Sequence, residues 1–188
     1  PQVLKNTLPD LNVLKKRNIS DEKFIFYPAQ FWKHKNHLNL LKAFVLVLKK
    51  HPTLKLILVG SKMNAFDEVE TYISEQNLSS SVHILGYVTN SEMIGLYKIA
   101  KAMIMPTFLG PTNIPPIEAS YFNCPVIYSK IYAYDEIPCN KMIFIDPNSI
   151  LSIEDGINRV LQKEVKFDID SNEKISWPTL TNKLLKIF

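Results

Sequence analysis

Residues 102–118 read AMIMPTFLGPTNIPPIE, and this stretch decides how we interpret the fold. An apolar run at 102–105 leads through a loop to Pro115 and Pro116, which suit the first turn of a helix. A helix that begins just after a strand points free amides and the positive end of its dipole at the space above the strand end. Phosphate commonly occupies such a position. The stretch therefore predicts a phosphate-binding unit, and a nucleotide-sugar site is our first hypothesis.

The rest of the chain repeats this alternation of apolar runs and helical stretches. We predict strands at 24–27, 54–59, 82–85, 102–105, 126–128 and 142–145, and helices at 36–50, 66–76, 91–99, 115–122 and 150–162. Ser91 is the expected N-cap of the third helix. This order is typical of right-handed β-α-β units. It predicts an α/β fold, a Rossmann-like parallel sheet of about six strands with helices on both faces.

Three segments are expected along the chain. Residues 1–20 have no clear period and are interpreted as an interdomain linker, 21–162 as the nucleotide-sugar-binding domain, and 163–188 as a C-terminal extension with a last helix. The basic run at 15–17 is interpreted as a solvated face, with a peripheral membrane contact as the alternative. No stretch is apolar enough for a membrane helix and no targeting segment is visible, so we expect a cytoplasmic protein, with the inner face of the membrane as a further option.

Composition excludes several functional classes. The chain has 188 residues, 46% of them hydrophobic, and a net charge of +4 that comes almost wholly from lysine. Arg17 and Arg159 are the only arginines, so a base-reading arginine cluster is absent and no nucleic-acid partner is expected. Cys124 and Cys139 lack zinc-ligand spacing, and the five glycines form neither a GxGxxG motif nor a P-loop. A dehydrogenase or an ATPase is therefore disfavoured.

The carboxyl ends of the strands should hold the ligand. The loop after the first strand brings Lys35 to a helix start, which suits a diphosphate. In the loop after the fourth strand, the amides of Thr112, Asn113 and Ile114 are expected to donate hydrogen bonds. Glu118 follows on the helix, where its carboxylate is placed to accept from sugar or ribose hydroxyls.

Several short motifs, in this order and spacing, resemble the donor-binding half of family 4 glycosyltransferases of the GT-B fold. They are FYP at 26–28, KNH at 35–37, LVG at 58–60, ILGYV at 84–88, LY at 96–97, PT at 106–107, PPIEA at 115–119 and CPVI at 124–127. The resemblance covers roughly residues 22–162. It implies a retaining hexosyl transfer from a nucleoside-diphosphate sugar to a glycan or lipid-linked acceptor, in surface polysaccharide synthesis such as that of lipopolysaccharide in bacteria. It implies neither a metal nor another cofactor.

The resemblance also implies roles for single residues. Lys35 would contact the donor diphosphate, Glu118 would hold the ribose, the amides of Thr112–Ile114 would hold phosphate and sugar, and the backbone near Val88 would meet the base. The acceptor would bind to an N-terminal half, so this chain alone is expected to bind a donor without turnover.

Two departures from the family pattern concern the sugar and the diphosphate. The family has two glutamates with seven residues between them, and the first falls here on Gly110. The arginine that accompanies the lysine falls near Ala29, with Gln30 as the nearest polar substitute. We favour remodelled sugar contacts over weakened catalysis, because the turn chemistry from Asn113 to Pro116 is intact.

Other interpretations stay open for some residues and for the protein as a whole. His34 and His37 have no neighbours at metal-ligand spacing and are interpreted as ordinary histidines, and Trp32 packs under its loop or stacks on a base. The Asp168-Ile169-Asp170 motif lies in a polar connection beyond the sheet, where we expect no metal. The alternative functions are a GT-B-like nucleotide-sugar epimerase and a non-catalytic flavodoxin-like binding module.

Overall fold

A six-stranded parallel sheet forms the centre of the computed structural model, which describes residues 7–19, 23–110, 114–131 and 142–162. The strands are β1 (Phe24–Pro28), β2 (Lys55–Val59), β3 (Val82–Gly86), β4 (Ala102–Met105), β5 (Val126–Ser129) and β6 (Met142–Ile145). Their order in the sheet is β3-β2-β1-β4-β5-β6, and every neighbouring pair is parallel. The predicted sheet is therefore confirmed.

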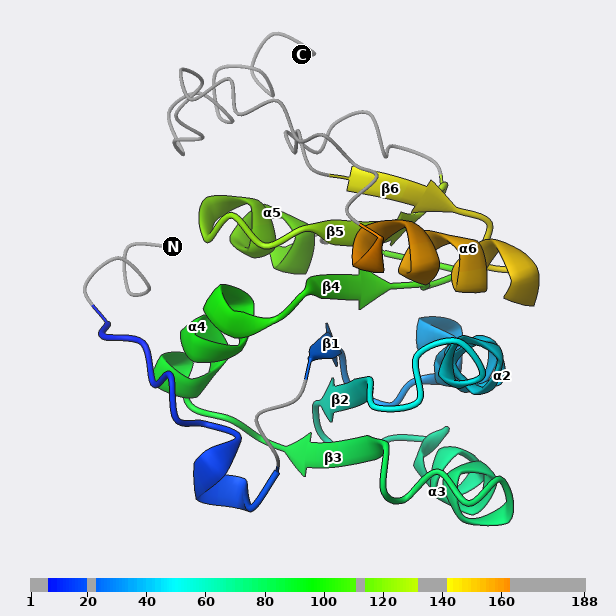
Figure 1. The fold of residues 1–188 in the computed structure, drawn as a ribbon, viewed down its shortest axis with the longest axis horizontal. Coiled ribbons are helices and arrows are strands. Elements are labelled where there is room, and N and C mark those ends of the chain that lie inside the picture. The colour runs from blue at the N-terminus through cyan, green and yellow to red at the C-terminus, as the bar shows by residue number, and fades with distance from the viewer. Residues whose placement is uncertain (1–6, 20–22, 111–113, 132–141, 163–188) are drawn as a thin grey trace, which may run out of the picture.

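Helices cover both faces of this sheet. The helices are α2 (His37–Leu48), α3 (Phe66–Glu75), α4 (Asn90–Ile99), α5 (Ile114–Tyr121) and α6 (Ile150–Leu161), with short 3-10 turns η1 (Lys15–Arg17) and η2 (Lys33–Lys35). Figure 1 shows α2, α3 and α6 on one side and α4 and α5 on the other. The central strands β1, β4 and β5 are buried along nearly their whole length and are mostly apolar, as expected for parallel strands that helices cover on both faces.

The start of α4 differs from the sequence prediction. Thr89, and not Ser91, is the N-cap: its Oγ1 accepts from the amide of Glu92, and the Glu92 carboxylate accepts from the amide of Thr89 at 2.8 Å. A reciprocal capping box satisfies two helix-end donors at once, which explains why the helix begins earlier. The hydroxyl of Ser91 donates instead to the carbonyl of Leu8 at 2.6 Å.

Residues 7–19 pack against the domain. Val13, Leu14 and Ile19 belong to the hydrophobic core, each less than a tenth exposed. In the basic run, Lys16 pairs with Asp10 at 2.6 Å and Arg17 pairs with Glu92 at 2.8 Å, so Arg17 is part of the fold and not of a fully solvated face. In the part of the chain that the structure describes, no helix is both long and apolar enough to cross a bilayer.

Candidate functional site

The candidate site lies at the carboxyl ends of β1 and β4, where the direction of the strand order reverses. β1 leads into α2 on one face of the sheet, whereas its neighbour β4 leads into α5 on the other face. Adjacent strands whose following helices lie on opposite faces form the ligand-binding crevice of open α/β sheets. Lys35 follows β1 and Glu118 follows β4, so the topology brings the two predicted donor-binding segments to one switch point.

Hydrogen bonds join the loops after β1 and β4. The carbonyl oxygen of His34 accepts from Oγ1 of Thr107 at 3.0 Å and from the amide of Phe108 at 2.9 Å. Thr107 is fully buried, so this bond is shielded from water. The two loops therefore form one unit, and Thr107 is a residue of the site to which the sequence assigned no role.

Asn36 connects a third loop to this unit. Its Nδ2 donates to the carbonyl of Pro106 at 2.9 Å and to that of Pro147, after β6, at 2.8 Å. Asn36 has a φ of 60° and is 5% exposed. Asparagine is one of the few residues other than glycine that commonly adopts this left-handed conformation, and its amide has two protons to donate. The sequence indicated Asn36 only as the first residue of a predicted helix and as part of the KNH motif at 35–37, with no role for its side chain.

Lys35 is the last residue of η2, and a side chain of β1 fixes its backbone. Its carbonyl oxygen accepts from Oη of Tyr27 at 3.0 Å. The side chain is partly buried, and burial lowers the pKa of its ammonium group. Gln30, by contrast, is exposed, and its Oε1 accepts from Nε1 of Trp32 at 2.9 Å. The Trp32 ring lies parallel to that of His34, with 6.5 Å between centroids, so it packs within its own loop.

His37 lies in the core beneath this loop. It is 2% exposed, and its ring stacks on Phe31 with a centroid distance of 4.5 Å and lies 4.8 Å from the ring of Tyr27. Burial lowers the pKa of His37 to about 3, so the imidazole is neutral at physiological pH. The described residues contain no group of three metal-ligating side chains, and His37 is a packing residue.

Glu118 lies on α5 and is oriented by a tyrosine on α4. Oη of Tyr97 donates to Oε2 of Glu118 at 3.0 Å. The Tyr97 ring is buried and has edge contact with Phe26 at 5.0 Å and stacks on Phe122 at 5.7 Å. Burial raises the pKa of Glu118, and the Tyr97 hydrogen bond opposes that rise. A carboxylate with one oxygen fixed in this way can offer its other oxygen to a ligand hydroxyl, and Tyr97 is thus a second residue to which the sequence assigned no role.

The other predicted donor-binding residues are placed in part. Val88 lies between β3 and α4 and is 7% exposed, whereas Ile114 is the first residue of α5 and is 52% exposed. Gly110 is partly buried and is the last described residue of the loop after β4. Thr112 and Asn113 lie outside the described residues, as does the Asp168-Ile169-Asp170 motif.

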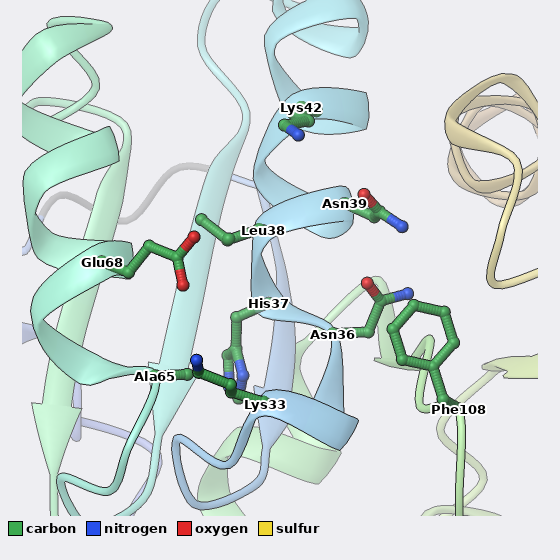
Figure 2. Close-up of a pocket in the computed structure, with 9 residues that line it drawn as sticks. All are labelled: Lys33, Asn36, His37, Leu38, Asn39, Lys42, Ala65, Glu68 and Phe108. Atoms are coloured by element: carbon green, nitrogen blue, oxygen red, sulfur yellow. The ribbon is translucent and has the colours of Figure 1, made fainter.

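A pocket of about 360 Å³ adjoins the joined loops on the α2 side. In Figure 2, Glu68 of α3 extends toward Leu38 of α2, Lys42 lies further along α2, and Asn36 lies next to Phe108. Neither Lys35 nor Glu118 lines the pocket. Its lining residues are Lys33, Asn36, His37, Leu38, Asn39, Lys42, Ala65, Glu68 and Phe108.

The family follows from a comparison with known proteins. The model of the family "Glycosyl transferases group 1" matches residues 12–176, which is most of the chain. The chain belongs to the group 1 glycosyltransferases. The match extends across both loops of the switch point and all six strands, so the resemblance found in the short motifs is confirmed.

Individual relatives agree with this membership. The chain is 25% identical to the O-antigen chain mannosyltransferase RfbU of Salmonella typhimurium, over 82% of this chain and 46% of the relative. It spans about half the length of the curated relatives it matches.

Solved structures show the same half-molecule fold. The chain resembles the C-terminal domain of a group 1 glycosyl transferase from Francisella tularensis with a TM-score of 0.76 and 17% identity, covering 92% of this chain and 98% of that one. It also resembles HepE of Anabaena in complex with UDP and glucose, with a TM-score of 0.76 and 14% identity, over 96% of this chain and 55% of that one. These likenesses place the chain in the GT-B fold as a C-terminal-type half.

Proposed function

We propose that this group 1 domain binds the donor of a retaining, metal-independent glycosyltransferase. The donor is a nucleoside-diphosphate sugar, and the acceptor is a glycan or a lipid-linked glycan bound by a separate N-terminal half. The relative from Salmonella acts, by its name, in O-antigen synthesis, which supports a role in surface polysaccharide synthesis at the cytoplasmic face of the membrane. The single observation that carries the proposal is the meeting of the Lys35 loop and the Glu118 helix at the switch point.

The chemistry follows from the charges at this crevice. In the transfer, the bond between the sugar and the diphosphate breaks, and negative charge develops on the departing phosphate oxygen. The ammonium group of Lys35 would stabilise that charge, together with the dipole of α5 and the amide of Ile114, which is the only amide donor among the first three residues of that helix. Contact with a diphosphate would also offset the lowering of the Lys35 pKa by burial, because a nearby anion favours the charged ammonium.

Glu118 would fix the nucleoside. The hydrogen bond from Tyr97 to Oε2 leaves Oε1 without a protein partner among the described residues, and that oxygen would accept from a ribose hydroxyl. Gly110 stands where the family has an acidic contact to the sugar, and Pro111 has no amide hydrogen. The contacts to the transferred sugar are therefore remodelled in this chain, whereas those to the nucleotide are retained.

Calorimetry with UDP and with GDP tests this proposal. Lys35→Ala and Glu118→Ala should each weaken binding of the preferred nucleotide about tenfold, as expected for loss of one hydrogen bond to a charged group. Lys98→Ala and Glu75→Ala remove the same charges from exposed helix positions and should bind like the wild type. Equal affinity in all five proteins would remove the site assignment.

A further inference from the structure

The segment before β1 is held tightly against the start of α4. The carbonyl of Leu8 accepts from Oγ of Ser91 at 2.6 Å, and the amide of Asp10 donates to the carbonyl of Ser91 at 2.9 Å. The backbones approach so closely at Gly95 that a Cβ added there would lie 2.0 Å from the carbonyl oxygen of Asp10. Only glycine allows this contact, so α4 is shaped to receive the segment.

Arg17, near the end of this segment, bonds to the last residues of β3 and to the first turn of α4, on either side of the loop that joins them. Its Nη1 donates to the carbonyl of Leu85 at 3.2 Å, and its Nη2 donates to Oε1 of Glu92 at 2.8 Å. Oε2 of Glu92 in turn accepts from the amide of Thr89 at 2.8 Å and from its Oγ1 at 3.0 Å. A guanidinium group can serve two acceptors in different directions, which an ammonium group on a flexible stem does less well.

The electrostatics of Glu92 agree with this arrangement. Burial alone would raise the pKa of Glu92, but the hydrogen bonds from Thr89 and Arg17 together bring it below its ordinary value. The carboxylate is therefore charged when it bonds to Arg17, and such charge-assisted bonds are stronger than neutral ones.

Residues 86–89, the loop held between these two anchors, contain the predicted nucleobase contact. Gly86 has a φ of +67°, which glycine adopts readily, and its carbonyl accepts from the amide of Gly60 at 3.0 Å. Tyr87 is 80% exposed and Val88 is 7% exposed. The path of this backbone is thus set at Leu85, at Gly86 and at Thr89, and Arg17 bonds directly or through Glu92 to two of these three points.

We infer that Arg17 is a positioning residue for the nucleobase: it fixes the 86–89 loop so that the backbone at Val88 can meet the base of a bound nucleoside diphosphate. This inference rests on the proposed function. Through the same contacts, residues 7–19 are coupled to the base end of the crevice, while the diphosphate end depends on the separate loops after β1 and β4. Loss of Arg17 should therefore weaken recognition of the nucleoside and spare recognition of the diphosphate.

The experiment compares Arg17→Ala with a matched variant, Lys50→Ala, in the 188-residue chain. Lys50, two residues after the end of α2, pairs with Glu154 of α6 at 3.0 Å, so its loss also removes one cation and one ion pair, but away from the 86–89 loop. Calorimetry would measure UDP, GDP and inorganic pyrophosphate, and hydrogen exchange would follow residues 86–92. Arg17→Ala should weaken the preferred nucleotide about tenfold, change pyrophosphate binding less than twofold and speed exchange in the loop, with Arg17→Lys in between.

The outcomes separate this inference from the proposed function. Unchanged nucleotide affinity in Arg17→Ala, or an equal loss for nucleotide and pyrophosphate, would overturn the positioning role. An equal loss in Lys50→Ala would overturn it too, because the effect would then be general. A wild-type chain that binds neither UDP nor GDP would instead overturn the proposed function, and the nucleobase role with it.

Discussion

Lys35 and Glu118 lie at the same switch point, but the structure holds them in different ways. The Lys35 loop is fixed by backbone-directed bonds from several residues, among them Tyr27 and Asn36. Glu118 lies on a regular helix, and its carboxylate is oriented by one tyrosine hydroxyl. Where no regular element fixes the backbone, buried side chains must do so. We call the Lys35 loop the cation side of the crevice, and Glu118 with its helix the carboxylate side. Substitutions on the cation side should therefore mainly lower folding stability, and those on the carboxylate side should mainly lower ligand affinity.

The largest effect is expected for Asn36→Ala. This change removes two buried hydrogen bonds and places alanine at a positive φ, so the free energy of unfolding should fall by about 3 kcal/mol. Asn77→Ala is the matched control, since Asn77 has a φ of 54° but is exposed, and it should cost only about 1 kcal/mol. Urea unfolding measures both, and equal losses would show that Asn36 does not join the loops energetically.

His37, which lies beneath the same loop, should make the free energy of unfolding depend on pH. The unfolded chain binds a proton near pH 6.5, whereas the folded His37 binds one only near its pKa of about 3. His37 therefore causes no loss of stability above pH 6.5. Below that pH it lowers the free energy of unfolding, by up to about 1.4 kcal/mol per pH unit.

His37→Phe keeps an aromatic ring in the stack and removes the titration. Urea unfolding at several pH values between 4 and 7 should therefore give a flatter profile than for the wild type. His83→Phe, at a half-buried histidine whose pKa burial also lowers, should flatten it less. Parallel profiles for His37→Phe and the wild type would contradict the buried neutral imidazole.

The sequence predicted the elements and the meeting of the two loops, because both follow from local patterns and strand order. Apolar runs located the strands, and Pro115 and Pro116 located the start of α5. The polar partners could not be predicted in this way. Asn36 bonds to carbonyls 70 and 111 residues away, and Arg17 bonds to a carboxylate 75 residues away. Such pairs depend on how loops close over the finished sheet, and a single sequence carries no periodic signal for them.

On the carboxylate side, Tyr97→Phe should lower ligand affinity and leave the fold nearly unchanged. The ring contacts with Phe26 and Phe122 remain, but the donor to Glu118 is lost. Loss of one such bond predicts about fivefold weaker UDP or GDP binding by calorimetry. Tyr121→Phe, on α5 and 47% exposed, should bind normally. Wild-type affinity in Tyr97→Phe would show that the hydroxyl does not orient the carboxylate.

Glu118→Gln should have the smallest effect on stability. The pH dependence that Glu118 contributes is opposite in sign to that of His37. The pKa of Glu118 is raised in the folded protein by burial, so folding disfavours its charge, and its contribution to stability falls as pH rises through that pKa. Glutamine can still accept from Tyr97 and carries no charge.

Glu118→Gln should therefore raise the melting temperature at pH 7 by about 1–2 °C, and the gain should shrink toward pH 4. Glu75→Gln, at an exposed position on α3, removes the same charge and should give no such pH-dependent gain. The same variant at Glu118 should bind nucleotide less well, because an amide is a weaker acceptor for a ribose hydroxyl than a carboxylate. A less stable Glu118→Gln at pH 7 would mean that the carboxylate stabilises the fold, and the contrast between the cation and carboxylate sides would fail.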